Sequence, residues 1–239
     1  MDYDTGLREA EKVIRSLSYR HSTHDVWNGF LELVYCVFVN RTHFPGSKRF
    51  NEIEERYEKE KARWGDKWDD HCKLLAIVTM AHGGRDFLGD LAGKLEALNA
   101  AQGQFFTPWP VCQLMTAMTI SDKLPAKGYE LVAEPASGGG AMVLAYAEAR
   151  RSQGHTVGET MWVEATDVSP QAQKMTYIQL TLSGIPARVT WGNTLTMETW
   201  EAEFTMACET FLEKHGFPSG DKVRLDARGK PVRRRKRND

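Results

Sequence analysis

The stretch Glu134-Pro-Ala-Ser-Gly-Gly-Gly140 decides the fold of this chain of 239 residues. A short apolar run, Tyr129–Ala133, precedes it, and a helix-forming run, Ala141–Arg151, follows it directly. Glycines between a strand and a helix let a ligand approach the backbone, and the start of the helix offers unpaired N–H groups. The order of these segments predicts a ligand-binding turn, although a glycine-rich turn before a helix is often only a tight connection.

Short apolar runs continue after this turn and alternate with helical stretches. Strands are predicted at Tyr129–Ala133, Met161–Ala165, Ala187–Trp191 and Phe204–Cys208, and helices at Ala141–Arg151 and Pro170–Leu182. This alternation is typical of an α/β fold with a parallel sheet and crossover helices.

The first part of the chain shows helical periodicity instead. Helices are predicted from a cap at Asp4 or Thr5 to Leu17, and at Thr23–Val39, Phe50–Trp64, Trp68–Met80 and Arg85–Asn99. The predicted organisation is a helical N-terminal region over residues 1–100, an α/β domain over residues 101–216, and a basic, mobile tail over residues 217–239.

The composition excludes several classes of protein. With 41% hydrophobic residues the chain is too apolar for global disorder. It contains no apolar run of about 18 residues, which argues against a membrane partner, and its polar, acidic N-terminus is not typical of a secretory signal. The four cysteines are scattered without metal-site spacing, which predicts a cytoplasmic protein without a bound metal.

The near-neutral net charge of −1 conceals an uneven distribution. Residues 221–239 contain nine Lys or Arg and three Asp, a net charge of +6, so the other 220 residues carry about −7. The cluster Arg233, Arg234, Arg235, Lys236 and Arg237 would suit DNA phosphates, whereas a solvated end that aids solubility explains the same charges.

Two polar residues follow predicted strands of the α/β part. Asp167, just past Met161–Ala165, suits the ribose hydroxyls of a nucleoside cofactor, but Asp167 or Ser169 would also cap the helix that begins at Pro170. Asn193, just past the next strand, suits the rim of an adenine ring.

Together with Gly103-Gln-Phe-Phe-Thr-Pro108, these residues resemble the γ-type N6-adenine DNA methyltransferases, and most closely the modification subunit of type I restriction systems. The hexapeptide is similar to the family's G-[QE]-[FY]-[FY]-T-P element, and Glu134–Gly140 is similar to its D-P-A-C-G-S-G element. Asp86-Phe-Leu-Gly-Asp90 is similar to the family's helical lead-in.

The resemblance implies a Rossmann-like methyltransferase sheet that binds S-adenosylmethionine. By position, the methionine end of the cofactor would lie beside Phe106, Thr107, Pro108, Glu134, Ser137, Gly138 and Gly140. Asp167 would take the ribose, and Asn193 would lie at the adenine, where the family usually has Asp.

The family's catalytic Asn-Pro-Pro-aromatic motif is absent from this sequence. Aligning residues 203–207 as the fourth strand places Cys208-Glu209-Thr210-Phe211 at its position, so that Phe211 would stack on a flipped base and Glu209 would accept a hydrogen bond. Cys208 supplies no amide oxygen. The two hypotheses are a small DNA adenine-N6 methyltransferase of phage or mobile-element type, and an inactive relative acting in a restriction–modification or phage-defence setting.

Few residues follow Phe211, so the expected sheet is either truncated or completed by residues 1–100 and a second chain. The expected partners are DNA and a specificity subunit, a second methyltransferase subunit or a second copy.

Overall fold

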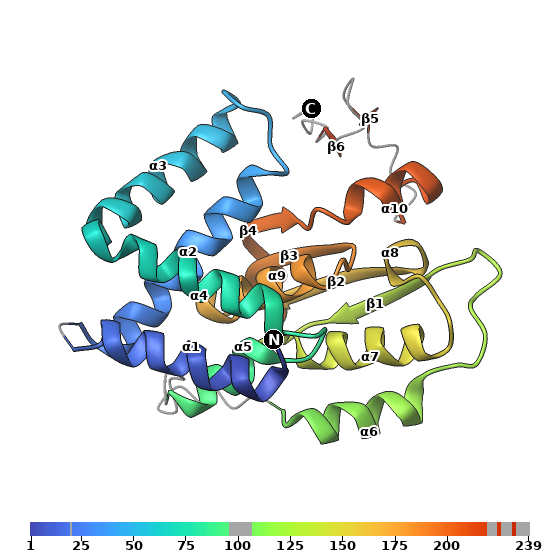
Figure 1. Cartoon of the computed structure of the whole chain (residues 1–239). Coiled ribbons are helices and arrows are strands. Elements are labelled where there is room, and N and C mark those ends of the chain that lie inside the picture. The colour runs from blue at the N-terminus through green and yellow to red at the C-terminus, as the bar shows by residue number, and fades with distance from the viewer. Residues whose placement is uncertain (20, 96–106, 219–223, 226–230, 233–239) are drawn as a thin grey trace.

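The computed structural model describes residues 1–19, 21–95, 107–218, 224–225 and 231–232. Figure 1 shows the N-terminal helices beside a sheet whose strands come from the second half of the chain. Within the described ranges no helix has the length and apolar character needed to cross a membrane.

The N-terminal region is helical, as predicted. It contains α1 (Tyr3–Leu17), α2 (Thr23–Asn40), α3 (Lys48–Trp64), the short 3₁₀ helix η1 (Gly65–Lys67), α4 (Trp68–Ala81) and α5 (Phe87–Lys94).

The predicted caps of the first helix were wrong. Asp2 is the cap, because its carboxylate accepts a hydrogen bond from the Thr5 N–H at 3.0 Å, and Asp4 lies within the first turn. The fifth helix ends at Lys94 with Leu95 at its C-cap, and residues 96–99 of its predicted range, like the predicted boundary near residue 100, lie outside the described residues.

The second half forms a four-stranded sheet of β1 (Glu130–Glu134), β2 (Met161–Asp167), β3 (Ala187–Asn193) and β4 (Glu198–Phe204). The strands lie in the order β1-β2-β3-β4, and the first three are parallel. The helices of this half are α6 (Trp109–Thr119), α7 (Ala141–Ser152), α8 (Val157–Thr160), α9 (Pro170–Leu182) and α10 (Cys208–His215), followed by the short strands β5 (Arg224–Leu225) and β6 (Pro231–Val232). An α/β fold is therefore confirmed.

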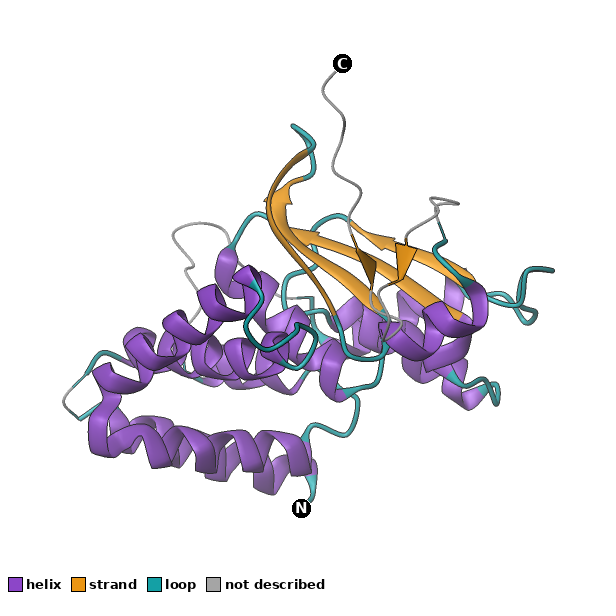
Figure 2. Ribbon diagram, turned by 90° about the horizontal axis from the view of Figure 1, so that it is seen from above, coloured by secondary structure: helices purple, strands orange, loops and turns teal. Residues whose placement is uncertain are grey.

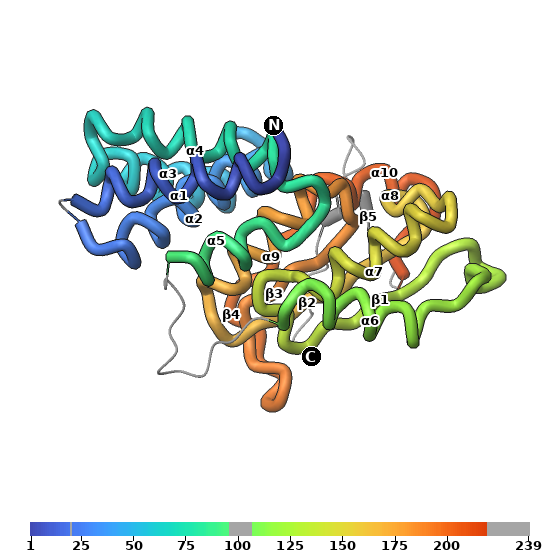
Figure 3. Tube along the Cα trace, turned by 60° about the horizontal axis from the view of Figure 1, so that its bottom comes forward, coloured from blue at the N-terminus to red at the C-terminus, as the bar shows by residue number. Residues whose placement is uncertain are grey.

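The fourth strand differs from the prediction in place and direction. It ends at Phe204 and runs antiparallel to β3, because the chain reverses directly after Asn193. The Asn193 side-chain oxygen accepts hydrogen bonds from the backbone N–H groups of Leu195 and Thr196 at 2.9 and 3.3 Å, and Met197 has a positive φ of 60°. This turn makes a hairpin where a fourth parallel strand was expected, and Figure 3 shows it projecting from the sheet.

The helical region and the sheet share their cores. Met175 and Ile178 of α9 pack in the cluster formed by α1, α2, α4 and α5, and Tyr35 and Val39 of α2 pack with the sheet and α7. Figure 2 shows most helices gathered on one side of the sheet. The N-terminal helices are therefore part of the support for the strands that carry the candidate site.

Candidate functional site

The carboxyl ends of the three parallel strands bring three predicted cofactor residues to one edge of the sheet. Glu134 ends β1, Asp167 ends β2 and Asn193 ends β3. The register places Glu134 beside Ala165 and Asp167 beside Trp191, so all three side chains belong to the same edge. Ligands of open α/β sheets bind at this edge.

The glycine turn leads from β1 into α7 along the same edge. Gly138 and Gly140 have positive φ values of 54° and 95°, a conformation that side chains rarely adopt. Gly140 is the residue that precedes the first turn of α7. The backbone of the turn is therefore shaped by its glycines, as the sequence predicted.

Asp167 holds the turn against β2. Its Oδ2 accepts a hydrogen bond from the Gly138 N–H at 2.8 Å, and its Oδ1 accepts one from the Ser169 N–H, also at 2.8 Å. Each carboxylate oxygen can accept a further hydrogen bond, so the side chain retains acceptor capacity for ligand hydroxyls. Of the two residues predicted as possible caps of the helix that begins at Pro170, Ser169 is the cap of α9, because its hydroxyl accepts a hydrogen bond from the Ala172 N–H.

Helix α9 holds the other side of the turn. The Thr176 hydroxyl donates to the Gly138 carbonyl at 2.8 Å, and the Gln179 amide donates to the Gly139 carbonyl at 2.7 Å. Because residues three apart lie on the same face of a helix, Thr176 and Gln179 hold two successive peptides from one side. Ser137, also in the turn, is within 3.1 Å of the Thr176 hydroxyl.

The site is acidic. Burial raises the pKa of Glu134 and of Asp167, although backbone N–H groups that donate to each carboxylate act in the opposite direction. Burial also raises the pKa of Asp86, which lies against the turn, to about 6. In the described parts of the chain none of the three carboxylates pairs with a Lys, Arg or His. Such a site favours a ligand that carries positive charge.

Asp86 is a site residue whose role the sequence did not reveal. A Cβ atom added at Gly139 would lie 3.0 Å from the Asp86 carboxylate, which places this side chain directly behind the turn. The only signal in the sequence was the resemblance of residues 86–90 to the family's lead-in, which assigned no role to the carboxylate.

The predicted hexapeptide lies partly outside the described residues. Phe106 and the residues before it are not described, whereas Thr107 and Pro108 directly precede α6 and Pro108 stands at its N-cap position. The Thr107 carbonyl accepts a weak hydrogen bond from the Cys112 thiol at 3.6 Å. The basic cluster Arg233–Arg237 also lies outside the described residues.

The three candidate catalytic residues do not join this edge. Cys208 and Phe211 are buried in α10, and the Cys208 thiol donates to the carbonyl of Ala187, the first residue of β3, at 3.3 Å. They therefore lie at the amino edge of the sheet, opposite the glycine turn. The predicted placement of Cys208, Glu209 and Phe211 at the end of a fourth parallel strand was wrong, because β4 returns antiparallel and ends at that opposite edge.

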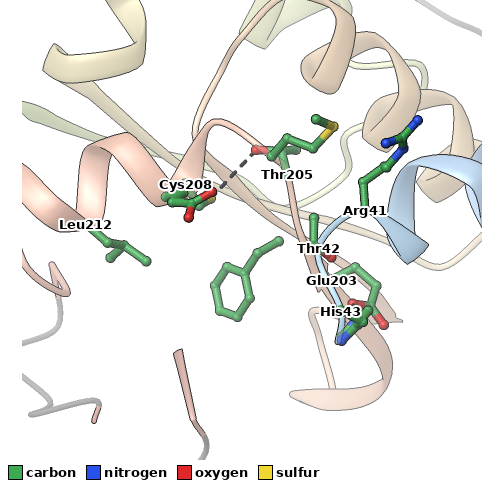
Figure 4. A pocket seen from close by; sticks show the side chains of 10 residues that line it. Arg41, Thr42, His43, Glu203, Thr205, Cys208 and Leu212 are labelled. Carbon is green, nitrogen blue, oxygen red and sulfur yellow. Dashed lines mark hydrogen bonds and ion pairs between the residues drawn. The ribbon is translucent and has the colours of Figure 1, made fainter. Parts of the chain in front are cut away.

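A cavity of about 160 Å³ lies beside Cys208 and Glu209 at the amino edge (Figure 4). Its walls come from the segment just after α2, the end of β4 and the start of α10. Its acidic group Glu203 pairs with His43 at 2.8 Å and Arg49 at 2.7 Å. No residue of the glycine turn or of the ends of β2 and β3 lines it. It is therefore separate from the candidate site.

Comparison with known proteins agrees with the geometry. The family model described as N-6 DNA Methylase matches residues 86–223, and no curated protein matches the chain significantly. The matched segment covers more than half of the chain and begins at Asp86, behind the glycine turn. By this match, the chain belongs to the N-6 DNA methylase family.

Proposed function

We propose that the protein binds S-adenosylmethionine at the carboxyl edge of β1, β2 and β3 and serves methyl transfer to the exocyclic N6 of adenine in DNA. The observation that carries the proposal is the pairing of the glycine turn with Asp167, joined by the 2.8 Å hydrogen bond from the Gly138 N–H. Family membership supports the same chemistry.

The described residues fit this cofactor in shape and charge. Asp167 has spare acceptor capacity for two ribose hydroxyls, and the turn has no side chains at Gly138, Gly139 and Gly140 to keep a ligand from the backbone. The uncompensated carboxylates Glu134 and Asp167 suit the sulfonium and ammonium groups of S-adenosylmethionine. When bound, S-adenosylmethionine supplies an electrophilic methyl group. Thr107 and Pro108 belong to the proposed wall beside its methionine end.

Asn193 has a double role in this proposal. Its side-chain oxygen already closes the β3–β4 turn, so its amide nitrogen is the group left to meet the adenine of the cofactor. The Thr194 hydroxyl donates to the Pro135 carbonyl at 2.7 Å and ties the hairpin to the glycine turn. The hairpin thus holds Asn193 at a fixed place along the proposed site.

A second candidate function is cofactor binding without methyl transfer by this chain alone. The observation that favours it is the position of Phe211, which is fully buried with its ring 5.2 Å from that of Trp162. A buried ring cannot stack on a flipped base. The chain would then act as a partner, regulator or inhibitor in a restriction–modification or phage-defence setting.

We also propose DNA and a second protein chain as partners. In the part of the chain that is described, no strand pairs with the outer edge of β1. Val111, Leu114, Met115 and Met118 form an exposed apolar stripe at helical spacing on α6, and Leu131 of β1 is exposed as well. An unpaired edge strand and an exposed apolar helix face are surfaces that a specificity subunit, a second methyltransferase subunit or a second copy would cover.

Transfer of a labelled methyl group decides between the two functions. The protein is incubated with tritiated S-adenosylmethionine and DNA that lacks adenine methylation, and the nucleosides are then separated. Label in N6-methyladenine that is absent with Asp167→Ala supports the enzyme and excludes the inactive relative. Cofactor binding without label in any of a broad set of DNAs supports the second function for the isolated chain.

A further inference from the structure

A buried carboxylate lies behind the glycine turn without an evident structural need for its charge. Asp86 caps α5, where its Oδ1 accepts a hydrogen bond from the Gly89 N–H at 3.1 Å, yet only 4% of the residue is exposed. Asn caps helices about as well as Asp. Capping therefore explains a polar side chain at this position but does not explain a charged one.

The charge of Asp86 is not neutralised by the cation next to it in the chain. The Arg85 guanidinium lies over the rings of Tyr3 and Trp109, with its central carbon 4.1 and 5.9 Å from their centroids. Within the described ranges no basic side chain forms an ion pair with Asp86. A buried, unpaired carboxylate lowers stability, so its presence indicates a function.

Gln179 connects this carboxylate to the glycine turn. Its side-chain nitrogen donates to Asp86 Oδ1 and to the Gly139 carbonyl, both at 2.7 Å, and its oxygen accepts from the Leu88 N–H at 2.9 Å. Both hydrogens of the Gln179 amide are thus used. If the amide were reversed, its oxygen would face these two acceptors and could not donate to either of them. The ionised carboxylate, which can only accept, thus acts together with the Gly139 carbonyl and the Leu88 N–H to hold the Gln179 amide in one orientation.

We propose that Asp86 is a positioning residue, which acts through Gln179 to hold the glycine turn in the shape that receives the cofactor. The inference rests on the proposed function. Peptide planarity links the two groups: with the Gly139 carbonyl held toward α9, the N–H of Gly140 points the opposite way, where it donates to the Ser137 carbonyl at 2.7 Å and closes the turn. The Thr176 hydroxyl does the same for the preceding peptide by holding the Gly138 carbonyl.

Protonation of Asp86 would weaken this arrangement. Gln179 and Gly89 both donate to Oδ1, and protonation of the carboxyl removes the negative charge that strengthens these two hydrogen bonds. Because burial raises the pKa of Asp86 to about 6, the change falls in a range that binding measurements reach. Cofactor affinity should decline as the pH falls through about 6.

Other titratable groups near Asp86 must be separated from it. Asp90 lies on the same helix, Tyr3 faces Asp86 from α1, and Cys112 faces it from α6. The turn before α5 adds Arg85 and His82, and α9 contributes the neutral Gln179. Within the site, Glu134 and Asp167 also have raised pKa values. The part of the pH dependence of cofactor affinity that is due to Asp86 is therefore the part that is lost when Asp86 is substituted.

The test compares Asp86→Asn and Gln179→Leu with the matched control Asp90→Asn, whose native carboxylate accepts from the Tyr3 hydroxyl and not from the turn. Calorimetry measures the Kd for S-adenosylmethionine at pH 5.5 and 8. Amide hydrogen exchange over residues 136–144 measures the turn without ligand. At pH 8 we expect Asp86→Asn and Gln179→Leu each to raise the Kd by about tenfold. The two effects should be non-additive in the double variant, and Asp90→Asn should leave the Kd unchanged.

The thermal midpoint separates positioning from a general loss of stability. Asp86→Asn removes an uncompensated buried charge, so its midpoint at pH 8 should equal or exceed that of the wild type while its Kd rises and loses part of its pH dependence. Equal Kd values for wild type and Asp86→Asn at both pH values would overturn the proposal. If the wild type binds no S-adenosylmethionine, the proposed function fails. Faster amide exchange in the turn of the two variants would then still show that Asp86 and Gln179 support the turn.

Discussion

At the scale of single residues, the site depends on backbone shapes that only glycine adopts easily. Gly140 has a φ of +95° and stands at the N-cap position of α7, and a Cβ atom added there would lie 3.5 Å from the Thr176 hydroxyl. A side chain at this φ costs about 1–2 kcal/mol. The turn therefore combines function with a local conformational requirement that can be measured.

We predict that Gly140→Ala lowers the free energy of unfolding by about 1–2 kcal/mol, because alanine disfavours the left-handed conformation. The matched control is Gly93→Ala in α5, where an added Cβ meets no atom within 4 Å and the backbone is helical. This control should gain about 0.5–1 kcal/mol. Urea denaturation measures both changes, and equal effects at the two positions would contradict the account.

The single residues also show what the sequence could and could not predict. The glycine turn and Asp167 were predictable because strand, turn and helix are contiguous in the chain. The role of Asp86 was not, because it depends on Gln179, which lies 93 residues away and meets it only through packing of α5 on α9. A resemblance pointed to residues 86–90, but only the tertiary structure gives the carboxylate a partner.

At the scale of elements, partly buried ion pairs join the helical region to the sheet half. Glu32 of α2 accepts from Arg56 of α3 at 2.8 Å and pairs with Lys174 of α9 at 2.7 Å. Arg56 also reaches Glu201 of β4. The antiparallel strand β4 is thus held against α2 and α3, a direction that periodicity alone could not predict, because a hairpin and a crossover both leave an alternating strand.

We predict that Glu32→Gln lowers stability at pH 7 by about 2–3 kcal/mol. Burial by itself would raise the pKa of Glu32, but the Arg56 hydrogen bond and the Lys174 charge outweigh it and lower the pKa from 4.5 to about 2. Because the folded-state pKa is depressed, the stabilisation is present above about pH 4.5 and is lost as the pH falls toward 2.

Urea denaturation at pH 7 and pH 3 measures this dependence. The wild type should lose more stability between the two pH values than Glu32→Gln does. The exposed Glu58→Gln, which removes an ion pair with Lys61 at 3.8 Å, serves as the control and should change stability by less than about 1 kcal/mol. Parallel losses in all three proteins would show that the Glu32 pairs contribute nothing.

At the scale of the whole molecule, the shared cores predict that the helical region and the sheet unfold together. Met175 of α9 packs with the N-terminal helices, and Tyr35 of α2 lies 5.0 Å from the Tyr177 ring. We expect tryptophan fluorescence and far-ultraviolet circular dichroism to report one coincident transition in urea. Two separated transitions would indicate independent domains and contradict the shared core.

The distribution of charge leads to a prediction for DNA binding. The body is acidic, whereas residues 221–239 carry a net charge of +6. If the tail binds phosphates, deletion of residues 222–239 should weaken DNA binding at low salt and reduce the slope of log K against log salt by up to about 0.9 for each phosphate that the tail neutralises. An unchanged slope in fluorescence anisotropy titrations would assign the tail to solubility alone.

The central claim is that the carboxyl edge of β1, β2 and β3 binds S-adenosylmethionine through Asp167, and isothermal titration calorimetry tests it most directly. The control is Glu164→Gln, which alters an acidic residue on the same strand that pairs with Arg188 instead of the turn. We predict saturable binding by the wild type and the control, and an affinity at least about tenfold weaker for Asp167→Ala. Absence of binding by the wild type, or equal binding by Asp167→Ala, would contradict the account.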